Sequence, residues 1–294
     1  MVKFVLAALL ALLPVAGSAQ PQGFAPTRFS VAVEGAGPDL ILIPGLMSGR
    51  RVWDGPVASL GGRYRVHRVQ IAGFAGEPAG ANAEGPLLAP LVEELHAYIE
   101  ANRLRHPMVA GHSIGGLLAL MLAARHPGEV SRALIVDALP FYGMLFGPGA
   151  TAANVEPRAA AFRDAMLAMS EEAFRAQQPA MLATLVRNEA ARPAVLEDVL
   201  ASDRGVAARA LYEDMVTDMR PALAAMRTPL TIAYALNPFA TEERVGSLFR
   251  TGFAGAPDVR FVPVEPSHHF IMLDQPDRFH ALLREFLEGA SDDG

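Results

Sequence analysis

Six short apolar runs, separated by segments with helical periodicity, constrain the fold of this 294-residue chain more than any other feature. We interpret the runs as buried strands at residues 40–44, 64–69, 107–111, 133–137, 230–235 and 259–264. The intervening segments repeat apolar residues at helical spacing, as in residues 87–100 and in the last helix, which starts at Pro276. Alternating strands and helices imply right-handed crossovers and a mostly parallel sheet covered on both faces. The predicted fold class is α/β with three layers.

The alternation stops after Asp137 and resumes only near Pro229. The segment between them is rich in alanine, helical in pattern and holds seven of the twelve methionines. We expect four prolines to interrupt its helices: Pro157, Pro179, Pro193 and Pro221. We predict that residues 138–228 form a helical cap inserted into a core of residues 28–137 and 229–290. Most of the methionines should join cap helices, and a few facing the sheet would line an adaptable apolar pocket.

The first residues have the layout of a cleavable secretory signal. Lys3 precedes an apolar run from Phe4 to Leu13, which a proline and several small residues follow. We expect cleavage after Ala19, which removes residues 1–19 and exports the mature protein to the periplasm or the medium. A stable membrane anchor is the disfavoured alternative, because about ten uninterrupted apolar residues fall short of the roughly 20 that span a bilayer.

Composition argues against several classes of site and partner. The chain contains no cysteine, so it has no disulfide framework, thiolate zinc site, cysteine nucleophile or lipid-modified cysteine. The net charge is −6 and the basic residues are scattered, which disfavours nucleic acid as a partner. The adjacent His268 and His269 make a poor metal site, because neighbouring side chains diverge and no cluster of further ligands is evident. We therefore expect no metal and no other cofactor.

The stretch VAGHSIGG, residues 109–116, raises the question of whether Ser113 is a nucleophile or a polar residue in an ordinary glycine-rich turn. Ser113 lies where a predicted strand gives way to a predicted helix. A nucleophile on such a turn needs strained backbone at the serine and no side-chain bulk at Gly111 and Gly115. The helix start would favour developing negative charge and offer the amide of Ile114 as an oxyanion donor. A dinucleotide-binding loop does not fit, because the serine replaces its second glycine.

Three stretches resemble the α/β-hydrolase fold, and in particular its serine hydrolases with a helical cap. Over residues 28–290, ILIPGLMSG is similar to the oxyanion strand and loop, AGHSIGG to the nucleophile elbow and SHHFIMLDQPDRF to the histidine loop. The stretches IAGFAGEPA and IVDALPF resemble a group of exported hydrolases within it. The family's usual His-Gly pair is here Pro44-Gly45, so the resemblance implies that Leu46 supplies the second oxyanion amide, with Met47 as the poorer candidate.

The resemblance also implies the chain order nucleophile, acid, histidine. It assigns the base to the histidine immediately before Phe270, which is His269. His268 is then a neighbour that faces solvent or lines the entrance. The remaining histidines are expected on the surface or in loops: His67, His96, His106, His112, His126 and His280.

The acid has more than one candidate. The position aligned with the family's usual aspartate holds Asn237, which carries no charge to stabilise an imidazolium. Some family members place the acid at the end of the preceding strand, which here is Asp137, and a carboxylate at a buried strand end needs a partner such as imidazole. We predict Asp137 as the acid; alternatively, it only organises the start of the cap while another carboxylate orients His269. The competing carboxylates are Glu242, Glu243 and Glu265.

These residues predict a serine hydrolase. His269 would remove the proton of Ser113, the serine would attack an acyl carbonyl, and the amides of Leu46 and Ile114 would hold the oxyanion. A small to medium, mostly apolar carboxylic ester or lactone is the expected substrate, because the cap is apolar and no arginine site for an anion stands out. The alternatives are carbon–carbon bond hydrolysis, cofactor-free perhydrolysis, and a non-catalytic ligand-binding protein on the same scaffold.

Overall fold

The computed structural model describes residues 24–289 of the chain. The predicted signal peptide, residues 1–19, lies outside the described residues. Within the described range, no helix combines the length and the apolar character that crossing a bilayer requires.

A seven-stranded sheet forms the centre of the molecule. Its strands are β1 (Phe29–Glu34), β2 (Asp39–Ile43), β3 (Arg65–Ile71), β4 (Met108–His112), β5 (Arg132–Val136), β6 (Leu230–Ala235) and β7 (Val259–Val264). They lie in the order β1-β3-β2-β4-β5-β6-β7, and every neighbouring pair is parallel except β1 with β3. This arrangement confirms the α/β fold class and the mostly parallel sheet.

The edge strand β1 is the one strand that the sequence analysis missed. Its sequence, FSVAVE, alternates apolar with small or polar residues, and its ladder starts where Phe29 pairs with Ile71. Only Phe29 is buried, because the strand lies at the sheet edge. Such a half-exposed alternation is a weaker signal than the continuous apolar runs of the central strands.

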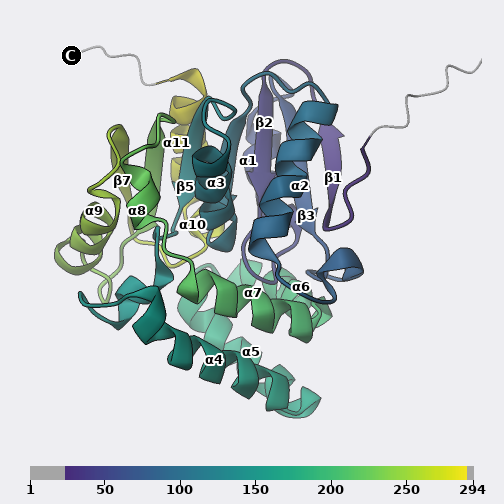
Figure 1. Cartoon of the computed structure of the whole chain (residues 1–294), viewed down its shortest axis with the longest axis vertical. Helices are drawn as coiled ribbons and strands as arrows, with labels where there is room; N and C mark the ends of the chain where they lie inside the picture. Colours follow the sequence, from purple (N-terminus) through teal and green to yellow (C-terminus); the bar gives the residue numbers. More distant parts are fainter. Residues whose placement is uncertain (1–23, 290–294) are drawn as a thin grey trace, which may run out of the picture.

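Helices cover both faces of the sheet (Figure 1). The core helices are α1 (Asp54–Ser59), α2 (Leu88–Ala101), α3 (Ile114–Arg125), α9 (Ser247–Phe253), α10 (Ile271–Asp274) and α11 (Pro276–Glu288). In Figure 1, α2 and α3 lie in front of the sheet, whereas α11 lies behind it and packs against α1. Because both faces are covered, the central strands are buried and their sequences are uninterrupted apolar runs.

Helix α3 is buried on all sides rather than along one stripe. Every residue from Ile114 to Ala123 is buried. An all-round apolar helix of this kind belongs to the interior of a domain. Its amino-terminus, which directly follows Ser113, is therefore held firmly within the core.

The chain between β5 and β6 forms a group of helices at the carboxyl edge of the parallel strands, at the bottom of Figure 1. They are α4 (Ala152–Ala168), α5 (Glu171–Leu185), α6 (Arg192–Ala201) and α7 (Arg204–Val216); the short α8 (Arg220–Leu223) follows them but lies higher in Figure 1, level with the strands. We refer to residues 138–228 as the cap. A separate small apolar cluster joins α4 and α7 to the start of the cap; its buried members are Phe141, Met144, Ala150, Val155, Ala159 and Met215.

The expectation that four prolines interrupt the cap helices is wrong for Pro157 and Pro179, because α4 and α5 continue through them. Pro157 lies inside α4 and Pro179 inside α5. Pro193 and Pro221 instead occupy the first turn of α6 and α8, where the missing N–H costs nothing because it has no partner within the helix. Sequence pattern alone does not separate these two cases, because the neighbouring residues are helix-forming in both.

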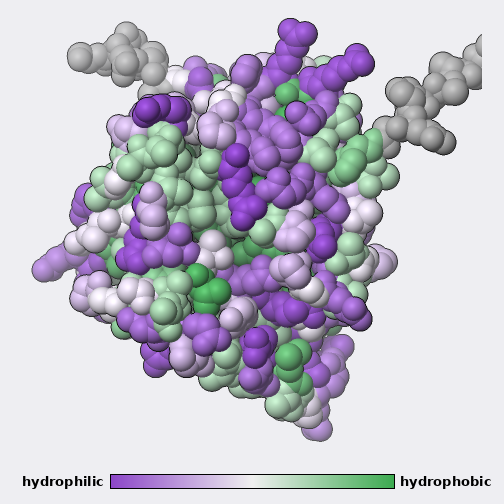
Figure 2. All heavy atoms as spheres, in the orientation of Figure 1, coloured by the Kyte–Doolittle hydropathy of each residue, from purple (hydrophilic) through white to green (hydrophobic). Residues whose placement is uncertain are grey.

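Large hydrophobic side chains are exposed on the outer side of the cap. Figure 2 shows hydrophobic spheres among hydrophilic ones at the lower end of the molecule, over the cap helices. The cap residues of this kind are Leu145, Phe162, Leu167 and Met181. Scattered exposed apolar residues are ordinary on a protein surface and carry no argument for a binding site by themselves.

Candidate active site

Ser113 lies between the end of β4 and the start of α3, with backbone angles of φ 54° and ψ −125°. This conformation is strained for a residue with a side chain. A Cβ at Gly111 would lie 2.1 Å from the carbonyl oxygen of Gly115, and a Cβ at Gly115 would lie 2.4 Å from that of Ile43. The structure thus confirms the predicted need for glycine at both positions, and the turn has the form of a nucleophile elbow.

The start of α3 offers an unused amide next to the serine. Ile114 is the first residue of the helix, so its N–H has no acceptor within the helix. The N–H groups of Gly116 and Leu117 are already used, because they donate to the carbonyl oxygen of Ser113 at 2.7 and 3.2 Å. The helix dipole and the Ile114 amide together favour negative charge beside Ser113.

The loop after β2 lies against the same serine. A Cβ at Gly45 would lie 3.2 Å from the Cβ of Ser113 and 2.8 Å from Nδ1 of His112. The chain therefore passes the elbow more closely than a side chain would allow. The next amide, that of Leu46, has no hydrogen-bond partner among residues 24–289. Leu46 and Ile114, the two candidate oxyanion donors, thus both have unused N–H groups in the neighbourhood of Ser113.

His269 and Asp137 form a hydrogen-bonded pair, with Nδ1 and Oδ2 2.7 Å apart. The other carboxylate oxygen of Asp137 accepts the N–H of Ala235 at 3.0 Å. Asp137 directly follows β5 and has a φ of 49°, a costly conformation for a residue other than glycine. These bonds hold the carboxylate between the tips of β5 and β6. Since a carboxylate only accepts, Nδ1 of the imidazole carries the hydrogen and Nε2 is left to accept a proton.

The other candidate acids lie elsewhere. The side-chain oxygen of Asn237 accepts the N–H groups of the residues two and three positions later, both at 3.0 Å, so Asn237 closes a turn. Glu242 accepts a hydrogen bond from the hydroxyl of Tyr234 at 2.9 Å. Glu243 and Glu265 are exposed. Among these residues, only Asp137 is hydrogen-bonded to His269.

His112 links the elbow to the histidine loop. Its Nε2 donates to the carbonyl oxygen of His269 at 3.0 Å, and the two rings lie 4.5 Å apart between centroids. Burial holds the pKa of His112 well below its usual value, and the charge of His269 lowers it further. His112 is therefore neutral at physiological pH.

His112, which bonds to the backbone of His269, directly precedes Ser113 in the chain. Within the described part of the chain, no hydrogen bond joins Oγ of Ser113 to the ring of His269. Such bonds are often long in enzymes without substrate and tighten when substrate binds.

The expectation that His67 and His112 are surface or loop residues is wrong. His112 ends a fully buried strand, and His67 is buried in β3, where its ring bonds to the hydroxyl of Tyr98 at 2.7 Å and to Asp39 at 3.0 Å. Each of these polar rings has a hydrogen-bond partner in the fold, which makes burial tolerable. Sequence alone did not reveal those partners.

One cluster among the described residues has the composition of a metal site, consisting of His96, His126 and Glu129. The two imidazole rings are stacked, with centroids 3.7 Å apart and planes 10° apart. Imidazole lone pairs lie in the ring plane, so two parallel rings do not direct them at one ion. Each ring also has its own carboxylate partner: His96 bonds to Glu129 at 2.8 Å and His126 to Glu93 at 3.1 Å. We assign no metal to this cluster.

A sequence profile described as the Alpha/beta hydrolase family matches residues 40–282. The match spans most of the 294 residues. The chain belongs to the alpha/beta hydrolase family. It is an enzyme of the hydrolase class, which agrees with the elbow at Ser113 and with the sequence-based expectation.

Two curated relatives of this alpha/beta hydrolase are esterases. It is 27% identical over 273 residues to the pimeloyl-[acyl-carrier protein] methyl ester esterase of Aromatoleum aromaticum, a match that covers 86% of this chain and 99% of the relative. It is 37% identical over 115 residues to the enzyme of the same name from Aeromonas hydrophila, covering 38% of this chain and 43% of the relative. The second match thus spans less than half the length of that relative.

Solved structures share the fold of this alpha/beta hydrolase over nearly its whole length. An esterase from Exiguobacterium antarcticum matches with a TM-score of 0.75 and 17% identity, covering 91% of this chain and 98% of the other. An enol-lactonase from Burkholderia xenovorans matches with a TM-score of 0.70 and 19% identity, covering 89% of this chain and 96% of the other. At these identities, the likeness shows a shared fold.

Asp214 is a residue near the site that the sequence analysis did not name. It lies on the cap helix α7, and burial raises the pKa of its carboxyl to about 7, an effect that the positive charge of His269 opposes. Burial likewise raises the pKa of Tyr142, and the charge of Asp214 raises it further. Asp214 is therefore near enough to His269 to interact with its charge, and Tyr142 lies near Asp214. Helical periodicity did not reveal them, because it does not say which face of a cap helix meets the sheet.

Proposed function

We propose that the protein is a serine esterase that uses Ser113, His269 and Asp137 as a catalytic triad. The observation that carries the proposal is the 2.7 Å bond between Nδ1 of His269 and Oδ2 of Asp137, beside a serine held on a strained turn. This is the arrangement that activates a serine hydroxyl as a nucleophile.

The chemistry follows from the atoms available. Nε2 of His269 takes the hydroxyl proton as Oγ of Ser113 attacks the acyl carbon, and the carbonyl oxygen becomes an oxyanion near the amides of Leu46 and Ile114. Asp137 stabilises the imidazolium. Collapse of the tetrahedral intermediate breaks the bond to the leaving alcohol, which takes the proton from the imidazolium. Water then repeats the sequence on the acyl-enzyme and releases the carboxylic acid.

The proposed substrates are small to medium, mostly apolar carboxylic esters or lactones. The similar proteins, which include methyl ester esterases and an enol-lactonase, support this range. The raised pKa of Asp214 also keeps a second negative charge away from the site below pH 7, which suits a neutral substrate.

A panel of p-nitrophenyl esters and lactones of graded acyl length tests the proposal on wild type and Ser113→Ala. Wild type should hydrolyse at least one member, and the variant should lose essentially all of that activity. A fluorophosphonate probe should label wild type and leave Ser113→Ala unlabelled. An unlabelled wild type without turnover would support the non-catalytic alternative instead.

We also propose that the protein is exported after removal of residues 1–19. The charged start, apolar run and small residues before Gln20 support this. Amino-terminal sequencing of the protein recovered from the periplasm or medium should begin at Gln20. Recovery of the full-length chain from the cytoplasmic fraction alone would exclude export.

A further inference from the structure

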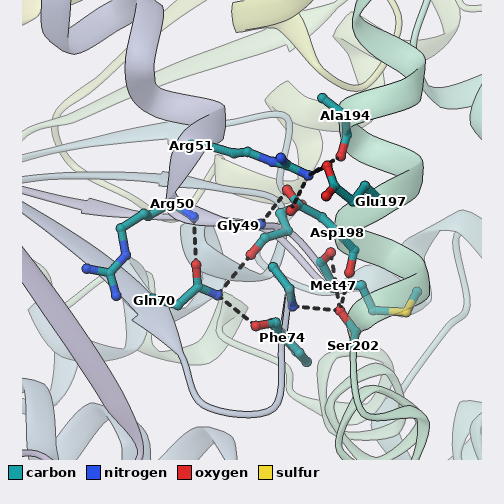
Figure 3. A network of polar contacts seen from close by, with 12 residues as sticks. Met47, Gly49, Arg50, Arg51, Gln70, Phe74, Ala194, Glu197, Asp198 and Ser202 are labelled. Carbon is teal, nitrogen blue, oxygen red and sulfur yellow. Dashed lines mark hydrogen bonds and ion pairs between the residues drawn. The ribbon is translucent and has the colours of Figure 1, made fainter. Parts of the chain in front are cut away.

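The cap helix α6 contacts the loop that carries Leu46 (Figure 3). Oδ2 of Asp198 accepts the N–H of Gly49 at 2.9 Å, and Oδ1 pairs with Nη2 of Arg51 at 2.8 Å. Arg51 reaches a second carboxylate, that of Glu197, also at 2.9 Å. Asp198 is buried, whereas the side chain of Glu197 is 72% exposed. The two neighbouring carboxylates therefore differ in burial and in contact with the loop backbone.

The loop held by Asp198 contains a strained turn. The N–H of Ser48 donates to the carbonyl oxygen of Gly45 at 3.2 Å, and Met47, inside this turn, has a φ of 52°. A non-glycine residue in this region costs on the order of 1–3 kcal/mol and persists only when its surroundings hold it. The Gly45–Leu46 peptide, which carries the candidate oxyanion amide, belongs to the same turn. Its orientation therefore depends on what holds the turn in place.

Two neutral side chains hold the loop from other sides (Figure 3). Oε1 of Gln70 accepts the N–H of Arg50 at 2.8 Å, and its Nε2 donates to the carbonyl oxygen of Ser48 at 3.4 Å. The hydroxyl of Ser202 lies 3.5 Å from the carbonyl oxygen of Met47. Asp198 differs from both because it is charged and its bond to Gly49 is short. Bonds to a charged acceptor are roughly twice as strong as neutral ones.

We propose that Asp198 is a positioning residue that holds the loop so that the Leu46 amide faces the oxyanion. This inference rests on the proposed function, because it requires Leu46 to be an oxyanion donor. Asp198 acts through Gly49 and does not itself touch the reacting atoms. The cap thereby takes part in transition-state stabilisation through one buried carboxylate.

The local geometry explains why residue 49 is glycine. A Cβ there would lie 2.8 Å from Oδ2 and 3.0 Å from Oδ1 of Asp198. The backbone angles of Gly49, φ −81° and ψ 155°, suit any residue. Glycine is therefore needed for the close approach of the carboxylate and not for its backbone conformation. Gly49→Ala should displace the carboxylate without straining the chain.

The test compares Asp198→Ala with Glu197→Ala, a matched control that removes the exposed carboxylate of the adjacent residue. Loss of one oxyanion donor costs about 10²- to 10³-fold in kcat. We expect Asp198→Ala to lower kcat at least tenfold with KM within about threefold, and Glu197→Ala to remain within twofold of wild type. The Ki of an alkylboronic acid, which forms a tetrahedral adduct with the serine, should rise by about the same factor as kcat falls. The Ki of the matching carboxylic acid product should stay within about threefold.

Two further variants complete the test. Asp198→Asn keeps a neutral acceptor for Gly49, so it should recover part of the lost kcat, because the bond is weaker than that to a carboxylate. Gly49→Ala should lower kcat at least tenfold. Gly49→Ala decides the matter if Asp198→Ala does not fold. A kcat within threefold of wild type in folded Asp198→Ala, or in Gly49→Ala if the former does not fold, would overturn the inference. So would parallel increases in Ki for the boronic acid and the product. An inactive, unlabelled wild type would instead overturn the proposed function, so the two failures are distinguishable.

Discussion

Replacing Asp214 with asparagine should stabilise the protein increasingly as the pH rises. Burial raises the pKa of this carboxyl from 3.8 to about 7, and no hydrogen bond from residues 24–289 to the carboxylate opposes that rise. The folded state therefore holds a proton that the unfolded state releases near pH 4. Asparagine has nearly the same shape and no charge, so Asp214→Asn removes the cost of ionising this group in the fold.

The sign and size follow from linkage. Between pH 4 and 7 the folded state binds more protons than the unfolded state, so wild-type stability falls as the pH rises through that window. Above pH 7 the group is ionised in both states and the full cost is present. A shift of about 3 units corresponds to about 4 kcal/mol. At pH 4.5 the same arithmetic leaves about 1 kcal/mol, so the advantage of Asp214→Asn should grow by about 3 kcal/mol between pH 4.5 and 8.5.

Urea unfolding of both proteins at pH 4.5, 6, 7 and 8.5 measures this difference directly. Asp164→Asn is the matched control, because it removes one negative charge from an exposed position on α4 of the same cap. The control should show no growth beyond about 0.5 kcal/mol across the range. A difference between Asp214→Asn and wild type that stays constant with pH would show that burial does not shift this carboxyl, and the reasoning would be refuted.

Three further substitutions test the site. Asp137→Asn should lower kcat by about 10³- to 10⁴-fold, because the amide no longer stabilises the imidazolium; a loss below tenfold in ester hydrolysis would exclude Asp137 as the acid. Gly111→Ala should cost at least about 3 kcal/mol of unfolding free energy, since its methyl would lie 2.1 Å from a carbonyl oxygen; thermal unfolding at an unchanged temperature would contradict the packing described for the elbow. Asn237→Asp should leave kcat within about threefold but cost about 1–3 kcal/mol of stability, because a carboxylate replaces the amide that donates to Ser267; a rise in kcat would indicate that position 237 can still serve the histidine.

The central strands could be predicted from the sequence because burial on both faces produces uninterrupted apolar runs. The edge strand β1 could not be recognised in the same way, since only Phe29 is buried there. The elbow was predictable for a local reason: the glycines at 111 and 115 are required by contacts within a few residues of Ser113 or with the adjacent strand. Local crowding requires glycine at fixed positions, which is visible in the sequence, whereas a half-exposed strand gives a weaker apolar pattern.

The parts of the site that depend on distant packing were harder to infer. The sequence left Asp137 and three glutamates open as partners of His269, and only the tertiary structure shows which carboxylate reaches the ring. Asp214 and Asp198 escaped notice because each belongs to a cap helix with charged residues on its other faces. The burial and the contacts of these two carboxylates depend on how the cap packs against the core, and no short stretch of sequence indicates that packing.

The parallel pairing of β5 and β6 has a consequence for how the cap could be exchanged in a protein chimera. The chain leaves the sheet at the carboxyl end of β5, immediately beyond Asp137, and re-enters at the amino end of β6. The chain that follows an inserted domain must therefore run along the full height of the sheet before it enters β6. Here α8 and the residues after it make that connection. A replacement cap that ends before α8 keeps this connection, whereas one that also replaces α8 must supply a new connection to the start of β6. The cap also begins directly after Asp137, whose carboxylate is paired with His269. A donor cap that displaces its own first residues would therefore disturb that pair before it altered any substrate contact.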